Sequence, residues 1–157
     1  MSVADFKKSV VYQIYPKSFS DSNGDGWGDL KGVTSKLDYI KELGADYIWL
    51  TPFFVSPQND NGYDVEDYYT IDPRYGTMED FEELAAEAEK RGIRLMLDMV
   101  FNHTSSRHEW FQKALAGDEK YKNFYIFRKG KAPGVPPTNW ESKFGGNVWE
   151  YVEQFDE

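Results

Sequence analysis

The chain has 157 residues, the length of one ordinary domain, and 40% of them are hydrophobic, as in globular proteins. Acidic residues outnumber basic residues by 27 to 18, so the net charge of −9 argues against a broad basic surface for nucleic acid or an anionic membrane. The sequence contains no cysteine, which excludes disulfides and thiolate metal sites.

The first nine residues lack the apolar core of a signal peptide. No apolar run approaches the roughly 20 residues that a membrane-spanning helix requires. We therefore expect a soluble, cytoplasmic protein that binds neither nucleic acid nor a membrane.

The amino-terminal part of the chain alternates strands with helices. Residues 10–16 are β-branched and aromatic, which predicts a first strand. Residues 30–43 carry apolar side chains at helical spacing, with Asp29 as a plausible N-cap and Gly44 just after the end. A second strand is predicted over residues 46–50.

A second helix and a third strand follow a long loop over residues 53–76. Thr77 with Asp80 resembles a capping box that opens a helix over residues 78–91. Residues 93–101 are nearly all apolar, which predicts a parallel strand covered on both faces. This alternation specifies an α/β fold with a parallel sheet and right-handed crossovers.

After His103 the periodic pattern ends. Residues 108–115 predict a short helix, and the aromatic, Gly- and Pro-rich text from Tyr121 onward predicts an irregular subdomain. Three strands and two helices leave open sheet edges, so we expect the chain to be a piece of something larger, a fragment able to self-associate through those edges.

Residues 21–29 form a candidate metal-binding loop. Oxygen side chains stand at positions 1, 3, 5 and 9, with glycine at position 6, which is the spacing that wraps Ca²⁺ in a tight loop. Position 12 is Gly32, so the bidentate Glu of an EF-hand is missing, and an ordinary Asp- and Gly-rich turn is the alternative. The spacing favours a structural metal held by Asp21, Asn23, Asp25, the carbonyl of Trp27 and Asp29.

Asp98 lies within the apolar run of the third predicted strand, and Asn102 and His103 follow it. A buried carboxylate costs several kcal/mol if unpaired, so Asp98 needs a partner. Two interpretations remain open: a salt-bridged core aspartate followed by a surface turn, or a functional cluster of these three residues.

The loop after the second strand contains a candidate sugar site. Asn61 and Gly62 supply a turn that can aim Tyr63 and Asp64 into a pocket. A tyrosine ring against a sugar face and a carboxylate bridging two hydroxyls suit a pyranose, and His103 could donate to a further hydroxyl. The alternative is an ordinary turn followed by a solvated aspartate.

Taken together, these segments resemble the amino-terminal part of the α-amylase superfamily (glycoside hydrolase family 13). The resemblance covers essentially every residue and is closest to the branch of oligo-1,6-glucosidases, dextran glucosidases and trehalose-6-phosphate hydrolases. Two stretches look most like the trehalose-6-phosphate hydrolases. The residues that carry the resemblance are 10–20, 21–29, 61–64 and 98–103, and the two stretches are 51–64 and 139–146.

The resemblance implies a TIM (β/α)₈ barrel. Residues 1–103 would supply its first three strands and two helices, and residues 104–157 would begin an inserted domain B. It also implies roles for single residues. Tyr63, Asp64 and His103 would line the subsite for the terminal glucosyl unit, Asp98 with Asn102 would be active-site structural residues, Phe144 would border the aglycone side, and residues 21–29 would hold Ca²⁺.

The family's reaction is retaining α-glucoside hydrolysis, with a nucleophile and an acid/base about 5 Å apart. In the family these carboxylates come from the fourth and fifth strands, so they are expected beyond residue 157 and this chain alone is expected to be inactive. The implied substrate is a small α-glucoside, either trehalose 6-phosphate, with Lys143 as a candidate phosphate contact, or an isomaltooligosaccharide.

Three alternatives stay open at this point. The parent protein could be an oligo-1,6-glucosidase or dextran glucosidase. It could also be a non-catalytic amylase-like subunit, or the chain could be a sugar- or calcium-binding module that stands alone.

Overall fold

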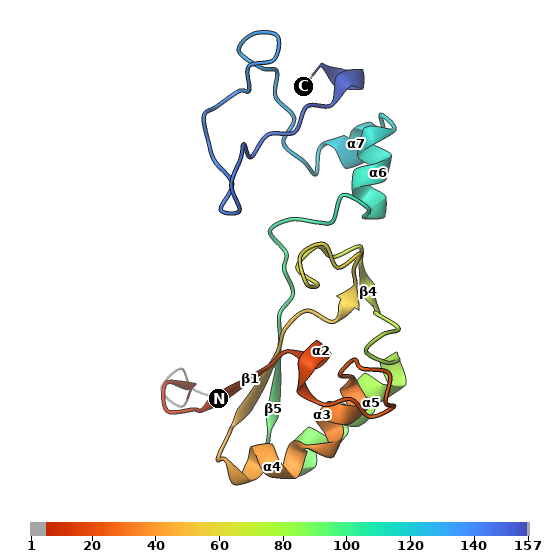
Figure 1. Ribbon diagram of the computed structural model, residues 1–157, viewed down its shortest axis with the longest axis vertical. Helices are drawn as coiled ribbons and strands as arrows, with labels where there is room; N and C mark the ends of the chain where they lie inside the picture. Colours follow the sequence, from red (N-terminus) through yellow and green to blue (C-terminus); the bar gives the residue numbers. More distant parts are fainter. Residues whose placement is uncertain (1–5, 157) are drawn as a thin grey trace. The chain divides into compact units, whose positions relative to one another are not determined.

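The computed structural model describes residues 6–156, which divide into two compact units, residues 6–109 and residues 110–156 (Figure 1). The first unit extends past His103, where the first domain is expected to end. The assignment of the two units to a barrel and a domain B stays a prediction.

The first unit contains a three-stranded parallel sheet, as the alternation of elements predicts. Its strands are β1 (Val11–Ile14), β2 (Tyr47–Leu50) and β5 (Arg94–Leu97), in the order β1-β2-β5. The last residues of the three strands, Ile14, Leu50 and Leu97, lie in register. All three strands therefore end at the same edge of the sheet.

The helices α3 (Leu30–Ser35), α4 (Leu37–Glu42) and α5 (Met78–Lys90) lie together beside this sheet (Figure 1). The predicted caps are confirmed: the Asp29 side chain accepts from the N–H of Gly32, and Thr77 and Asp80 form a complete capping box. The core between helices and sheet is built from fully buried aliphatic side chains. They include Ile14, Leu30, Val33, Leu37, Ile40, Ile48, Leu50, Leu84 and Ile93.

The helix predicted over residues 30–43 is interrupted at Lys36, where α3 ends and α4 begins. The hydroxyl of Thr34 donates to the carbonyl of Leu30, and that of Ser35 donates to the carbonyl of Gly32. Side chains that bond back to the preceding turn compete with the helical pattern and bend helices, which accounts for the break.

The third strand corrects the sequence-based expectation. β5 covers Arg94–Leu97 instead of residues 93–101, and its apolar side chains are half-buried. The prediction of a strand buried on both faces is therefore wrong. The reason is that β5 pairs with β2 alone among residues 6–156.

Three elements of the first unit were not predicted. Pro16 begins a short helix, α2 (Pro16–Phe19), in which its fixed φ suits the first helical position. The long loop contains an antiparallel pair, β3 (Phe54–Val55) and β4 (Asp67–Ile71). A second small cluster of Phe54, Val65 and Val100 packs there.

The second unit is irregular, as predicted. It holds α6 (Glu109–Leu115), which confirms the predicted short helix, α7 (Glu119–Lys122) and a 3₁₀ turn, η1 (Glu153–Phe155). Aromatic edges link these pieces, as in the pairs Trp110–Phe124 and Phe127–Phe155. Across residues 6–156, no helix combines the length and the apolar character needed to cross a membrane.

Close packing explains why position 12, counted from Asp21, is Gly32 and not the glutamate of an EF-hand. A Cβ atom at Gly32 would lie 1.9 Å from the carbonyl oxygen of Ser20, so no side chain fits there. Gly32→Ala is expected to lower the free energy of unfolding by about 1–3 kcal/mol, because the backbone must move to relieve the clash.

Chemical denaturation of the purified protein measures this effect. Lys31→Ala is the control, because the Lys31 side chain on the same helix is 63% exposed. It should change stability by less than about 0.5 kcal/mol. Equal stability of Gly32→Ala and the wild type would contradict the close packing at this site.

Candidate active site

The ends of β2 and β5 bring together four of the predicted site residues. The hydroxyl of Tyr63, from the loop after β2, lies 3.2 Å from Oδ2 of Asp98, which directly follows β5. Nε2 of His103 lies 2.8 Å from the carbonyl oxygen of Tyr63, and Asn102 contacts the His103 ring. Residues separated by 35 to 40 positions in the sequence therefore share one edge of the sheet.

Asp98 is half-buried and accepts a hydrogen bond from the Tyr63 phenol. No ion pair to Asp98 exists among residues 6–156, so the interpretation as a salt-bridged core aspartate finds no cation in the described chain. Burial, the charge of Asp98 and the hydrogen bond between them raise the pKa of Tyr63 to about 12. Tyr63 therefore remains a protonated donor at neutral pH.

His103 has both ring nitrogens engaged. A carbonyl can only accept, so Nε2 carries the proton that is donated to Tyr63. Nδ1 lies 2.5 Å from the side-chain amide of Asn102, so both ring nitrogens have a polar partner. A sugar hydroxyl that accepts from His103 would have to share or replace the bond to Tyr63.

The turn that carries Asn102 and His103 is strained. Val100 has a φ of 46°, in the left-handed region where β-branched residues are rare. The Tyr68 hydroxyl lies 2.8 Å from the carbonyl oxygen of Val100 and 2.6 Å from that of His103. Tyr68 on β4 thus holds the strained turn in place.

Asp64 is not a solvated aspartate, because its own loop binds its carboxylate. Oδ1 accepts from the Ser56 hydroxyl at 2.7 Å and from the N–H of Asp60 at 3.2 Å, and Oδ2 accepts from the N–H of Asn59 at 2.8 Å. Burial raises the pKa of Asp64, but these hydrogen bonds outweigh it and lower the pKa below its ordinary value. Asp64 is therefore a stable anion.

The turn predicted at Asn61 and Gly62 is present. Both residues have positive φ, 51° and 98°. A Cβ at Gly62 would lie 2.9 Å from the carbonyl oxygen of Pro52, so glycine is needed for the close approach as well as for the φ. Gln58 is also left-handed, with φ 62°, so the loop stores backbone strain next to Asp64.

Behind Asp64 lies a buried polar network that the sequence did not reveal. Asp72 and Ser56 are 2% and 4% exposed. Nε of Arg74 donates to Oδ1 of Asp72 at 2.8 Å, and Nη2 donates to the Ser56 carbonyl at 2.7 Å and to Oδ2 of Asp72. The only sequence signal was a pair of opposite charges on either side of Pro73.

A cavity of about 230 Å³ opens at the carboxyl ends of β1 and β2. Its lining includes Tyr15, Thr51, Asn61 and Tyr75. Nζ of Lys17, a further lining residue, donates to Oδ1 of Asn61 at 3.3 Å. The cavity lies at the end of the sheet where parallel α/β folds place ligands.

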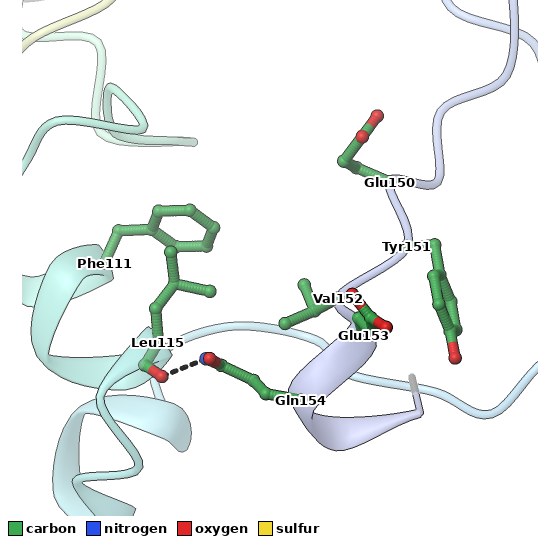
Figure 2. Close-up of a pocket in the computed structure, with 7 residues that line it drawn as sticks. All are labelled: Phe111, Leu115, Glu150, Tyr151, Val152, Glu153 and Gln154. Carbon is green, nitrogen blue, oxygen red and sulfur yellow. Dashed lines mark hydrogen bonds between the residues drawn. The ribbon is translucent and has the colours of Figure 1, made fainter.

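The second unit has a separate pocket of about 520 Å³ (Figure 2). It is lined by Phe111, Leu115 and residues 150–154, and the amide of Gln154 donates to the Leu115 carbonyl (Figure 2). Lys143 and Phe144 are exposed residues of this unit and are not part of the pocket lining; Phe144 is 89% exposed. Their predicted contacts with substrate stay predictions.

The 21–29 loop folds its oxygen side chains back on its own backbone. Asp21 accepts from the N–H groups of Asn23, Gly24 and Gly26, and Asp25 accepts from that of Trp27 at 2.7 Å. The bonds from Gly26 and Gly24 lower the pKa of Asp21. These bonds thus stabilise the ionised form of Asp21.

The side-chain oxygens of this loop are of the chemical type that binds a hard cation. Asp21, Asn23 and Asp25 offer carboxylate and amide oxygens, the type that Ca²⁺ prefers. Asp29 is the least available predicted ligand, because its two oxygens accept from Ser22 and Gly32. Within residues 6–156 no three His, Cys, Asp or Glu side chains cluster as a metal site, so a cation would depend on Asn23 and on backbone oxygen.

The ion pair between buried Asp72 and exposed Arg74 leads to a prediction about acid stability. Burial raises the pKa of Asp72, but Arg74 and a backbone hydrogen bond lower it below the ordinary value. A lowered pKa adds stability that is present above the unfolded pKa of about 3.9 and is lost as the pH falls through the folded value. Asp72→Asn should therefore be less stable at pH 7 by about 2 kcal/mol, less than for a fully buried pair because the Arg74 side chain is 39% exposed.

Thermal unfolding of the wild type and Asp72→Asn between pH 7 and pH 2.5 measures this difference. The difference between the two stabilities should begin to shrink below about pH 4 and should continue to shrink toward the lowered pKa of Asp72, because protonation of Asp72 breaks the same pair in the wild type. A difference that stays constant to the lowest pH would show that the Asp72 charge contributes nothing.

The sequence matches the family described as "Alpha amylase, catalytic domain" over residues 13–157. It is 58% identical over 149 residues to the trehalose-6-phosphate hydrolase of Bacillus subtilis strain 168, covering 94% of this chain and 27% of that protein. It is 55% identical over 153 residues to the oligo-1,6-glucosidase of Bacillus cereus, covering 97% of this chain and 27% of that protein. The chain therefore belongs to the α-amylase family.

The structure gives the same result. The crystal structure of Bacillus licheniformis trehalose-6-phosphate hydrolase matches with a TM-score of 0.89 and 61% sequence identity, over 94% of this chain and 27% of that chain. A trehalulose synthase structure matches with a TM-score of 0.87 and 54% identity, over 92% of this chain and 26% of that chain. The chain spans about a quarter of the length of the curated relatives it matches.

Proposed function

We propose that this chain supplies part of the glucosyl-binding site of a retaining α-glucoside hydrolase that acts on trehalose 6-phosphate. The observation that carries the proposal is the contact of Tyr63 with Asp98 and His103 at the carboxyl edge of a parallel sheet, in a member of the α-amylase family. In such folds ligands bind at this edge.

The proposed site binds the sugar through an aromatic ring and through anionic hydrogen-bond acceptors. The Tyr63 ring stacks on a sugar face while its hydroxyl stays on Asp98. Asp64 keeps part of its acceptor capacity, because a carboxylate offers about four lone pairs and the loop uses three. Asp64 therefore accepts from one sugar hydroxyl through Oδ2 and does not bridge two.

Neither Asp64 nor Asp98 is proposed as nucleophile or acid/base. A general acid needs a raised pKa, whereas that of Asp64 is lowered, and Asp98 is occupied in holding Tyr63. The two reacting carboxylates are assigned to the part of the relatives' length that this chain does not match. The three strands and their helices are assigned to the first part of a (β/α)₈ barrel.

The choice of trehalose 6-phosphate over α-1,6-glucosides rests on similarity. The chain is 58–59% identical to two trehalose-6-phosphate hydrolases and 52–55% identical to three oligo-1,6-glucosidases. An oligo-1,6-glucosidase is the second candidate. The cytoplasmic location and the self-association through sheet edges stay predictions from the sequence.

Steady-state hydrolysis of trehalose 6-phosphate, trehalose and isomaltose by the native polypeptide that contains this sequence tests the proposal. We expect kcat/KM for trehalose 6-phosphate to exceed that for the other two at least about a hundredfold, because a phosphate dianion adds charge-assisted hydrogen bonds. The 157-residue chain by itself should hydrolyse none of the three. A preference for isomaltose would support the second candidate, and hydrolysis by the 157-residue chain would overturn the assignment of the reacting carboxylates.

We also propose a structural Ca²⁺ in the loop of residues 21–29, held by Asp21, Asn23, Asp25 and the Trp27 carbonyl, with Asp29 at its edge. Calorimetric titration of the chelator-treated protein with Ca²⁺ should give saturable binding. Asp25→Ala should weaken binding by about tenfold or more, since one charged ligand is lost. Glu89→Ala removes the same charge from the exposed end of α5 and should leave the affinity unchanged; equal affinities of Asp25→Ala and the wild type would exclude the site.

A further inference from the structure

We propose that the cavity at the carboxyl ends of β1 and β2 is a binding site for a small oxyanion of the phosphate class, with Lys17 as its cationic contact. The cavity is separate from the contact of Tyr63 with Asp98 and His103, because none of these three residues lines it. Binding of an anion here therefore does not require a glucosyl unit at Tyr63.

The lining of the cavity carries a positive charge, although the chain as a whole has a net charge of −9. Lys17 is the only charged residue of the lining in the part of the chain that the structure describes. The other lining residues contribute hydroxyls, one amide and two proline rings; they are Tyr15, Ser18, Thr51, Tyr75, Asn61, Pro16 and Pro52. Because no carboxylate of residues 6–156 lines the cavity, the wall attracts an anion without repelling it.

The ammonium group of Lys17 is held by neutral partners. Nζ donates to Oδ1 of Asn61 at 3.3 Å and lies 4.6 Å from the centroid of the Trp27 ring. Lys17 forms no ion pair with any of residues 6–156, so its charge is not neutralised there. An ammonium has three donors, and two of them remain for a ligand after the bond to Asn61.

Buried hydroxyl groups add neutral donors to this charge. Thr51 and Tyr75 both line the cavity and are buried. Burial raises the pKa of the Tyr75 phenol, so it keeps its proton at neutral pH. A hydroxyl that donates to an oxyanion forms a charge-assisted hydrogen bond, which is stronger than a bond between two neutral groups.

The walls of the cavity are fixed by backbone contacts. The N–H of Thr51 donates to the Ile14 carbonyl at 3.0 Å, and the N–H of Gly28 donates to the Lys17 carbonyl at 2.8 Å. A Cβ at Gly28 would lie 2.0 Å from the carbonyl oxygen of Pro16, so the two backbones are in direct contact. A preformed site of this kind loses little conformational entropy when a ligand binds.

The size of the cavity restricts the ligand to a small one. Its volume of about 230 Å³ is below the roughly 300–1,000 Å³ of pockets that enclose drug-sized molecules. It equals the volume of about seven water molecules at about 30 Å³ each. Inorganic phosphate and the phosphate group of a small sugar ester share the chemistry that this cavity selects.

Calorimetric titration of the native polypeptide that contains this sequence tests the site. The ligands are inorganic phosphate and glucose 6-phosphate, each at constant ionic strength because salt screens weak surface attraction. Lys17→Met should weaken binding by about tenfold or more, since it removes a hydrogen bond to a charged group. Lys17→Arg keeps the positive charge and should retain most of the affinity.

Lys36→Met is the matched control. Lys36 is exposed, does not line the cavity and forms no ion pair with any of the described residues, so this variant removes the same charge away from the site. It should keep the affinity for both ligands within about twofold of the wild type, because an exposed charge is screened by salt.

Site-specific acylation of the wild type gives a second measurement, which holds even if a variant fails to fold. Mass spectrometry after treatment with an amine-reactive ester measures the acylation rates of Lys17 and Lys36 separately. Saturating ligand should slow the reaction at Lys17 and leave that at Lys36 unchanged. The reason is that a bound anion stabilises the protonated ammonium, which does not react.

The two ligands distinguish the source of the oxyanion. Lys17-dependent binding of inorganic phosphate assigns a free oxyanion, whereas Lys17-dependent binding of glucose 6-phosphate alone assigns a phosphate ester. Absence of binding of both ligands would overturn the site. Binding of glucose 6-phosphate that is unchanged in Lys17→Met, with no protection of Lys17 from acylation, would also overturn it while leaving the proposed function intact.

Discussion

The parallel pairing of β1, β2 and β5 is the constraint on which the candidate site depends. Ile14, Leu50 and Leu97 end the three strands in register, so the residues that follow them leave the sheet at one edge. Tyr63 and Asp98 meet there although 35 positions separate them in the sequence. A shift of one strand by a single residue would turn its core side chains outward and would remove this meeting.

The carboxylates of this region accept hydrogen bonds from different donors. The type of donor determines whether a carboxylate can still accept a hydrogen bond from a ligand. Asp72 is paired with a guanidinium and is fully used, which makes it structural. Asp98 accepts from a phenol and Asp64 from a hydroxyl and backbone N–H groups, so neither charge is neutralised by a cation in the described chain. An anion held only by neutral donors keeps its capacity to accept from a polar ligand.

The 21–29 loop is tied to the same region through Trp27. Its indole ring lies 4.6 Å from Nζ of Lys17 and 5.4 Å from the guanidinium carbon of Arg74. Lys17 in turn donates to Asn61, which belongs to the turn that carries Tyr63 and Asp64. The 21–29 loop and the turn at Asn61 are therefore linked through the side chains of Trp27 and Lys17.

The sequence by itself determined the alternation of strands and helices, the caps at Asp29 and Thr77, the Asn61–Gly62 turn and the motifs that place the chain in the α-amylase family. These features are local, since each depends on spacing and on the backbone preferences of a few neighbouring residues. Only the tertiary structure decided that β5 ends at Leu97, that His103 donates to the Tyr63 carbonyl, and that Ser56, Asp72 and Arg74 stand behind Asp64. Those outcomes depend on which distant groups meet in space, and a hydroxyl such as that of Ser56 carries no pattern in the sequence that names its partner.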